Sequence, residues 1–294
     1  MLQASDQYGE LRVTARGLWL GGVSLDGEVR RGVGVLCDAR KGVRAHANLL
    51  CSQELALCTG MQRGLFVPWQ QALTLGRLAV ALSPAGAGPG TALARVHAAG
   101  RDWLDARAAC LEPLPGFAPA EVPRTDVVVI NARLAGRACA NAPHLRLFLS
   151  NVPSSSAVVF DDPLLAFAAA TALSELGRPW RGAKGLAQAW RRRLGQLTPR
   201  ATKGKGDPIV LSLLGDAPPS AAFFVGDASH GLPEGVERLP LTRSLHGEQA
   251  AALVRACGAT VVVAVGSDGA ALAAQLPGVL VIVLRALAQP LLVP

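Results

Sequence analysis

The sequence is poor in aromatic and charged residues. Of its 294 residues, Phe, Trp and Tyr make up 4% and Asp, Glu, Lys and Arg 17%. Half of the residues are apolar, which argues against disorder over most of the chain. No apolar run reaches the roughly eighteen residues that a membrane-spanning helix needs, and the first residues lack the basic-then-apolar order of a secretory signal. We therefore expect a soluble, cytoplasmic protein without a membrane partner.

Motifs for metal binding are also missing. The six cysteines form no CxxC pair, no HExxH motif occurs, and the five histidines have no second ligand at metal spacing. In a chain of this size without an export signal, reduced and mostly buried thiols are the expected state. We therefore predict neither a metal site nor disulfides, and the sequence indicates no particular cofactor.

Acidic residues are absent from residues 176–206, which carry nine of the 29 basic residues. These are Arg178, Arg181, Lys184, Arg191, Arg192, Arg193, Arg200, Lys203 and Lys205. The remaining 20 basic residues face all 21 acidic ones, so the net charge of +8 is concentrated in this segment.

The pattern of elements predicts an α/β fold, with a β-rich N-terminal section followed by a largely parallel, helix-covered sheet. Residues 1–111 form the N-terminal α+β section, with a hairpin turn at Asp26-Gly27, a helix near residues 47–59 and a second helix that begins at Thr91. Residues 112–124 hold four prolines and are the predicted linker. Residues 125–294 form the α/β domain, with a basic helix and linker at 178–207.

Short apolar runs indicate buried strands at residues 126–130, 145–149, 156–160, 208–214, 221–225, 260–265 and 279–284. Asp162 and Pro163 predict the start of a helix that ends at Gly177. Another helix is expected at about residues 247–257. The thirteen residues 266–278 are just long enough for a parallel crossover.

The first candidate ligand site is the turn formed by Gly266, Ser267, Asp268 and Gly269. Ligands of α/β folds bind at the carboxyl ends of parallel strands, where helix amides attract anions. The turn has neither GxGxxG nor Walker A spacing. It resembles the Gly-Gly-Asp-Gly loop of the NAD kinase and diacylglycerol kinase superfamily, with Val265 at the first glycine and Ala270 at the following threonine. We expect it to turn the chain, with Asp268 as helix N-cap.

The second candidate site is the loop after residues 221–225, where Asp227, Ser229 and His230 follow a predicted strand. A histidine there titrates near neutral pH and can act as a general acid or base, with Asp227 orienting it. The strand–Ser-His-Gly order resembles the histidine loop of caspase-like cysteine peptidases. That resemblance implies a cysteine after a following strand, where this chain has Gly266 and Ser267. The polar side chains of the loop equally suit turn hydrogen bonds.

The third candidate site is the basic segment, whose predicted anion-binding residues are Arg181, Lys184, Arg191, Arg192, Arg193, Lys203 and Lys205. Residues 182–194 can form a helix and residues 198–207 a flexible linker. Trp180 and Trp190 either stack on nucleic-acid bases or form the apolar side of the helix. A solvated surface is the alternative to anion binding.

Two functions follow from these sites. One is a transferase or hydrolase that acts on an anionic substrate at the carboxyl edge of the C-terminal sheet. The other is a non-catalytic binding or assembly protein that holds nucleic acid or an acidic protein on the basic segment. A degenerate enzyme fold retained as a scaffold is a form of the second. The sequence does not decide whether the protein is an enzyme, nor its oligomeric state.

Overall fold

The structure is a computed structural model of the chain. It describes residues 11–14, 17–20, 23–26, 34–36, 50–51, 65–66, 68–75, 78–98, 100–202, 206–217, 222–227, 235–284 and 291–292. By its internal contacts the chain divides into two compact units. Unit 1 comprises Met1–Leu111, Ala118–Ala138 and Ser244–Pro294, and unit 2 comprises Glu112–Phe117 and Cys139–Arg243. This division differs from the one expected from the sequence, because residues 112–124 and 125–294 each contribute to both units.

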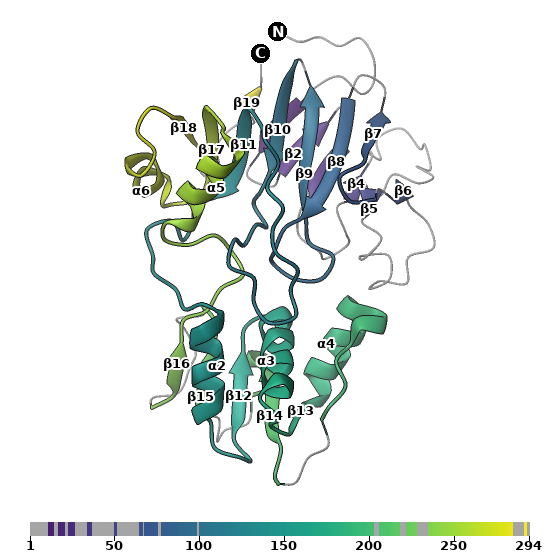
Figure 1. Ribbon diagram of the computed structural model, residues 1–294, viewed down its shortest axis with the longest axis vertical. Coiled ribbons are helices and arrows are strands. Elements are labelled where there is room, and N and C mark those ends of the chain that lie inside the picture. Colours follow the sequence, from purple (N-terminus) through teal and green to yellow (C-terminus); the bar gives the residue numbers. More distant parts are fainter. Residues whose placement is uncertain are drawn as a thin grey trace. The chain divides into compact units, whose positions relative to one another are not determined.

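Unit 1 contains a seven-stranded mixed sheet in the order β18-β17-β11-β10-β9-β8-β7 (Figure 1). Its strands are β7 (Ala72–Leu75), β8 (Leu78–Pro84), β9 (Ala92–Ala98), β10 (Arg101–Asp105), β11 (Val127–Asn131), β17 (Val261–Val265) and β18 (Leu280–Leu284). The four strands from β18 to β10 are parallel, whereas β9, β8 and β7 are antiparallel to their neighbours. The predicted parallel crossover between β17 and β18 is confirmed.

The other strands of unit 1 are short. One sheet has the order β19-β1-β2-β3-β4, made of β19 (Leu291–Leu292), β1 (Leu11–Thr14), β2 (Gly17–Leu20), β3 (Val23–Asp26) and β4 (Gly34–Leu36). In addition, β5 (Leu50–Cys51) pairs with β6 (Leu65–Phe66). The prediction of a β-rich N-terminal section is therefore confirmed.

Two helices of unit 1, α5 (Gln249–Cys257) and α6 (Gly269–Ala274), cover one face of the seven-stranded sheet. Alternate residues of a strand point to the same face, so Val128 and Ile130 of β11 meet the apolar side of α5 in one buried core. Gly258, with φ +69°, ends α5 in the left-handed conformation that favours glycine.

Unit 2 is a five-stranded, all-parallel sheet in the order β13-β14-β12-β15-β16. The strands are β12 (Ala157–Phe160), β13 (Trp180–Gly182), β14 (Ile209–Leu213), β15 (Phe223–Val225) and β16 (Glu237–Leu239). The helices are α2 (Ala142–Asn151), α3 (Pro163–Glu175), α4 (Lys184–Leu194) and two 3₁₀ turns, η2 (Gly195–Leu197) and η3 (Leu214–Asp216). The two units together confirm the predicted α/β class.

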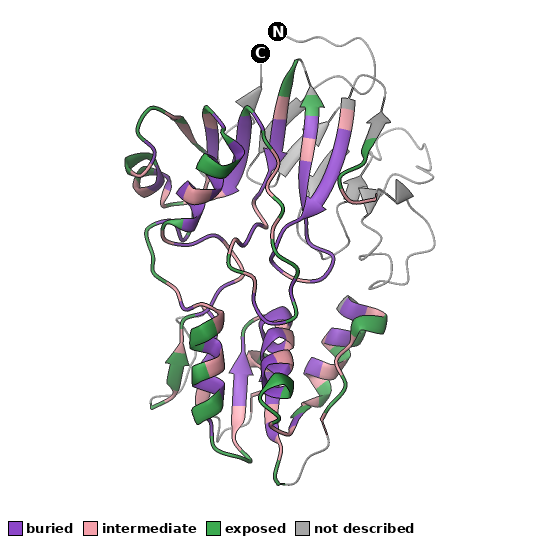
Figure 2. Ribbon diagram, viewed as in Figure 1, coloured by how far each residue is buried: buried purple, intermediate pink, exposed green. Residues whose placement is uncertain are grey.

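The helices α2, α3 and α4 pack on the strand face that carries Val158, Phe160 and Leu211 (Figure 1). The central helix α3 begins as predicted, with Pro163 in its first turn and the Asp162 side chain accepting a hydrogen bond from the Leu164 amide at 2.7 Å. Figure 2 shows that α3 is buried along most of its length, whereas α4 is buried on one side only. Of these two helices, α4 therefore presents the larger exposed side to solvent.

Two predicted elements are wrong. Residues 145–149 form part of α2, where the buried Leu145, Phe148 and Leu149 follow a helical spacing and the Asn141 side chain caps the first turn. The segment predicted as a helix from Thr91 forms β9 and β10. In β9 the residues from Ala94 to His97 alternate between apolar and polar, as in a strand, whereas Ala92, Leu93 and Ala94 are all buried and show no alternation.

Two further predictions fall on the N-terminal section. The prediction of a tight turn at Asp26-Gly27 is wrong. Asp26 pairs with Gly34, so the two strands are joined by seven residues, 27–33. In the predicted helix at residues 47–59, Leu50 and Cys51 instead form β5, and the other residues lie outside the described part.

Among the described cysteines, Cys110 and Cys257 are buried and Cys139 is half-buried. Burial raises the pKa of the Cys257 thiol above its ordinary value. Among the described residues there is no helix of sufficient length and apolarity to cross a membrane, and no group of three or more His, Cys, Asp or Glu side chains arranged to hold a metal ion.

Candidate functional site

Two aspartates meet at the carboxyl edge of the unit 2 sheet. Phe160 ends β12 and Val225 ends β15, and these two residues pair in the parallel ladder. Asp161 and Asp227 therefore follow neighbouring strand ends. The Asp227 amide donates to Asp161 Oδ2 at 2.7 Å, so the backbone of one strand-end loop is anchored on the carboxylate of the other.

Gly226 makes this contact possible. Its φ is +155°, and a Cβ added there would lie 2.3 Å from both Cγ and Oδ1 of Asp161. No other residue type leaves room for that carboxylate in this backbone conformation. The loop sequence Gly226-Asp227 is thus explained by the approach of Asp161, a residue that sequence reasoning did not select.

The neighbouring Asp162 has two partners. Its Oδ1 caps α3 through the Leu164 amide, and its Oδ2 accepts from Arg243 Nε at 2.8 Å and Nη2 at 2.5 Å. The Arg243 side chain is 14% exposed, so the ion pair is screened less than a surface pair. Arg243 is 81 positions away in the sequence, and no local pattern indicates the pair.

The predicted catalytic group is described only in part. Asp227 lies at the strand end where it was predicted, with its amide bound to Asp161. Ser229 and His230 lie outside the described residues, so their predicted roles stay predictions. The structure adds Asp161, Asp162 and Arg243 to this edge of the sheet.

The turn after β17 belongs to unit 1 and is shaped by packing. Gly266 has φ +124°, and a Cβ there would lie 2.9 Å from the Arg133 backbone nitrogen. A Cβ on Gly269 would lie 2.6 Å from Val283. Both glycines therefore allow close approach of neighbouring strands and loops.

The polar residues of this turn bind each other. Asp268 occupies the N-cap position of α6 as predicted, yet its side chain accepts no amide hydrogen bond from the helix. Instead Ser267 Oγ donates to Asp268 Oδ1 at 2.9 Å. This turn and the Asp227 loop belong to different units.

The basic segment forms an exposed face on α4. Leu186, Trp190 and Leu194 lie four residues apart and are buried, so the opposite side of the helix faces solvent. Besides Arg200, which follows η2, the exposed cations of the basic segment that the structure describes are Lys184, Arg191 and Arg192 of α4 and Arg181 of β13. We call these four residues the basic face. The side chains of Arg193, Lys203 and Lys205 lie outside the described part of the chain.

The cations of the basic face form no ion pair with any other described residue. An acidic residue does lie at the start of the helix: the Asp216 carboxylate lies against Gly185 in the first turn of α4. A negative charge at the N-terminus of a helix is stabilised by the helix dipole. The later turns of α4, which carry Arg191 and Arg192, remain positively charged.

Both tryptophans of the segment belong to the core, so the base-stacking interpretation is wrong. Trp180 and Trp190 are 2% and 1% exposed and contact each other edge-to-face at 5.9 Å. Trp190 Nε1 donates to the Pro163 carbonyl at 2.7 Å, and Trp180 Nε1 donates to Ser174 Oγ at 2.9 Å. They hold α4 against α3 and the sheet.

The segment after α4 is partly fixed. Thr202 Oγ1 donates to the Arg178 carbonyl at 3.2 Å and lies 3.3 Å from the donating Trp180 amide. The predicted flexible linker at 198–207 is therefore attached to β13 at Thr202.

Comparison with known proteins shows only the fold. The chain matches no model of a protein family, and no curated protein is significantly similar to it. It is similar in structure to a protein of unknown function from Enterococcus faecalis V583, with a TM-score of 0.51 and 10% sequence identity. The match covers 79% of this chain and 68% of that chain. At this identity the similarity supports the α/β fold and says nothing of activity.

Proposed function

We propose that the protein binds the phosphate backbone of nucleic acid through the basic face of α4. The observation that carries the proposal is a set of exposed cations on α4 that form no ion pair among the described residues, while the buried Trp190, in contact with Trp180 of β13, fixes the other side of the helix. Such a row releases counterions from a polyanion when it binds.

The burial of Trp180 and Trp190 defines the expected mode of binding. No described aromatic ring of this segment is available to stack on a base, so we expect the protein to make no base-specific contacts. Affinity then comes from phosphate contacts alone, so it is independent of sequence and falls steeply with salt. For three or four phosphate contacts, the logarithm of the binding constant should fall with the logarithm of salt concentration with a slope of about −3.

We expect replacement of Arg191, Arg192 and Arg193 by Gln to weaken binding to a fluorescent DNA duplex on the order of tenfold to a hundredfold at low salt. The slope against salt should become shallower by about one for each cation that contacts a phosphate. Fluorescence anisotropy over a salt series measures both quantities, and heparin retention gives an independent check.

A matched control separates a local face from net charge. Arg101, Arg137 and Arg238 are exposed residues outside the basic segment, and their replacement by Gln removes the same three charges. This control should keep most of the affinity and the full slope. Equal losses in the two variants, or unchanged binding in the first, would contradict the proposal.

A second candidate function is supported by the contact between Asp161 and Asp227 at neighbouring strand ends. We infer that this edge of the sheet holds an anionic substrate for a transferase or hydrolase, with His230 as acid or base. Hydrolysis of p-nitrophenyl phosphate and p-nitrophenyl acetate tests it. We expect His230→Ala to abolish turnover while the melting temperature changes by only a few degrees. Wild-type rates equal to those of buffer would count against an enzyme.

A further inference from the structure

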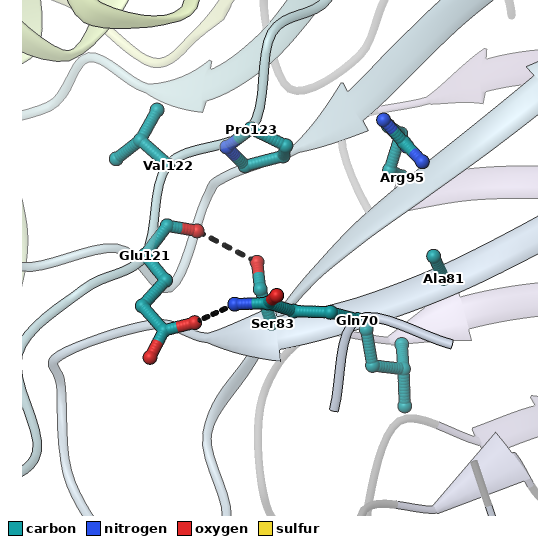
Figure 3. A pocket seen from close by; sticks show the side chains of 8 residues that line it. Gln70, Ala81, Ser83, Arg95, Glu121, Val122 and Pro123 are labelled. Atoms are coloured by element: carbon teal, nitrogen blue, oxygen red, sulfur yellow. Dashed lines mark hydrogen bonds between the residues drawn. The ribbon is translucent and has the colours of Figure 1, made fainter. Parts of the chain in front are cut away.

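A pocket of about 460 Å³ opens in unit 1, and none of the site residues that the sequence selected is among its lining residues. Its lining residues are Gln70, Ala81, Leu82, Ser83, Arg95, Glu121, Val122 and Pro123. Three segments supply them: the turn before β7, the paired strands β8 and β9, and residues 121–123 (Figure 3). The volume lies within the range of small-molecule sites, roughly 300–1,000 Å³.

The pocket walls are held by backbone hydrogen bonds. The Gln70 amide donates to the Leu82 carbonyl at 2.7 Å, and the Glu121 amide donates to the Pro84 carbonyl at 3.0 Å. Ser83 Oγ donates to the Glu121 carbonyl at 2.8 Å. The two segments that flank the pocket, at Gln70 and at Glu121, are thus both hydrogen-bonded to β8. The pocket therefore has its shape before any ligand binds.

Gln70 is held in an unusual backbone conformation at the pocket. Its φ is +63°, which residues other than glycine rarely adopt. Its side chain donates through Nε2 to Glu121 Oε2 across the pocket wall. Strained residues of this kind cluster at ligand sites, where the surrounding structure fixes them.

Two opposite charges line the pocket without pairing to each other. Arg95 is half-buried on β9, and within the described residues it makes no ion pair or hydrogen bond. Glu121 binds Gln70 and not Arg95. Figure 3 shows Arg95 and Glu121 on opposite sides of Ser83 and Gln70. A half-buried guanidinium that has no partner among the described residues favours a bidentate anionic group, and the carboxylate opposite favours a cation.

We propose that this pocket binds a small zwitterion, a free amino acid or a short peptide, with its carboxylate on Arg95 and its ammonium group on Glu121. Gln70 and Ser83 lie between the two charges and supply polar contacts. Ala81, Leu82, Val122 and Pro123 supply an apolar surface for the remainder of the ligand. A simple anion would meet the charge of Glu121, so a ligand with both charges fits the lining better.

The proposal is tested by titration calorimetry with alanine, alanyl-alanine and trialanine as probes. Each length is compared with its N-acetylated form, which lacks the ammonium group, and its amide, which lacks the carboxylate. We expect at least one of the three zwitterions to bind with a dissociation constant on the order of millimolar or lower, and both blocked forms to bind on the order of tenfold more weakly.

Variants link the binding to the two charges. Arg95→Gln should weaken the zwitterion and the N-acetylated form, whereas Glu121→Gln should weaken the zwitterion and the amide. Arg101→Gln, on the neighbouring strand and outside the pocket lining, should change nothing. The proposal is overturned if no zwitterion binds, if a blocked form binds equally well, or if binding survives in both pocket variants.

Discussion

Gly86→Ala is expected to lower the free energy of unfolding by about 3 kcal/mol or more. Gly86 has φ +77°, and a Cβ there would lie 2.0 Å from the Cys110 carbonyl oxygen and 3.1 Å from the Ala120 nitrogen. Both neighbours are backbone atoms. The Cys110 amide also donates to the Ala85 carbonyl at 2.8 Å, so this part of the chain cannot move away without losing a hydrogen bond. Denaturant unfolding measures the loss.

Gly100→Ala is the matched control for this prediction. Gly100 has φ +73° but no heavy atom within 4 Å of an added Cβ. Only the cost of the left-handed conformation applies, about 1 kcal/mol. The difference between the two variants then measures the steric contact at Cys110. If both lose the same stability, the backbone around Cys110 yields and the close approach is not rigid.

The sequence predicted those elements whose signals are local. After one polar residue, the predicted strands at 126–130, 156–160 and 260–265 are uninterrupted apolar runs, and each forms a strand with parallel neighbours. Asp162 and Pro163 mark the start of α3 through a cap that involves only the next residues. Patterns of this kind need no knowledge of the rest of the chain.

The wrong assignments of helix and strand fall on segments whose apolar residues fit both the two-residue spacing of a strand and the three-to-four-residue spacing of a helix. In residues 145–149 every second residue is apolar, but the buried set is Leu145, Phe148 and Leu149, while Leu147 is 64% exposed. The cap that decides between strand and helix is Asn141, followed by Pro143. The alanine-rich β9 carries a related ambiguity, because alanine suits a helix and also fits the buried part of a strand, where Ala92 and Ala94 lie.

The division into units and the charged contacts depend on distant residues. β11 pairs with β17, although the long segment of unit 2, Cys139–Arg243, lies between them in the sequence. Asp161 and Asp227 are 66 positions apart. Nothing in the local sequence of either aspartate indicates its partner. Likewise, nothing in the local sequence of Arg95 or Glu121 indicates that both residues line one pocket.

Trp190→Ala is expected to lower the free energy of unfolding by about 3–5 kcal/mol. The side chain is 1% exposed, contacts Trp180 edge-to-face, and donates to the Pro163 carbonyl at 2.7 Å. Its loss leaves a large cavity between α4, α3 and the sheet. Trp190→Phe keeps much of the ring but not the hydrogen bond, so a smaller loss is expected. Thermal or denaturant unfolding distinguishes the two.

This variant also tests how the basic face acts. At a temperature where Trp190→Ala is still folded, its affinity for a DNA duplex should fall, because α4 no longer holds Lys184, Arg191 and Arg192 in a fixed row. Gln188→Ala, on the exposed side of the same helix, should change stability by no more than about 0.5 kcal/mol and leave binding intact. If Trp190→Ala loses stability but keeps its affinity, the cations act as independent charges, and the rigid docking of α4 serves the fold alone.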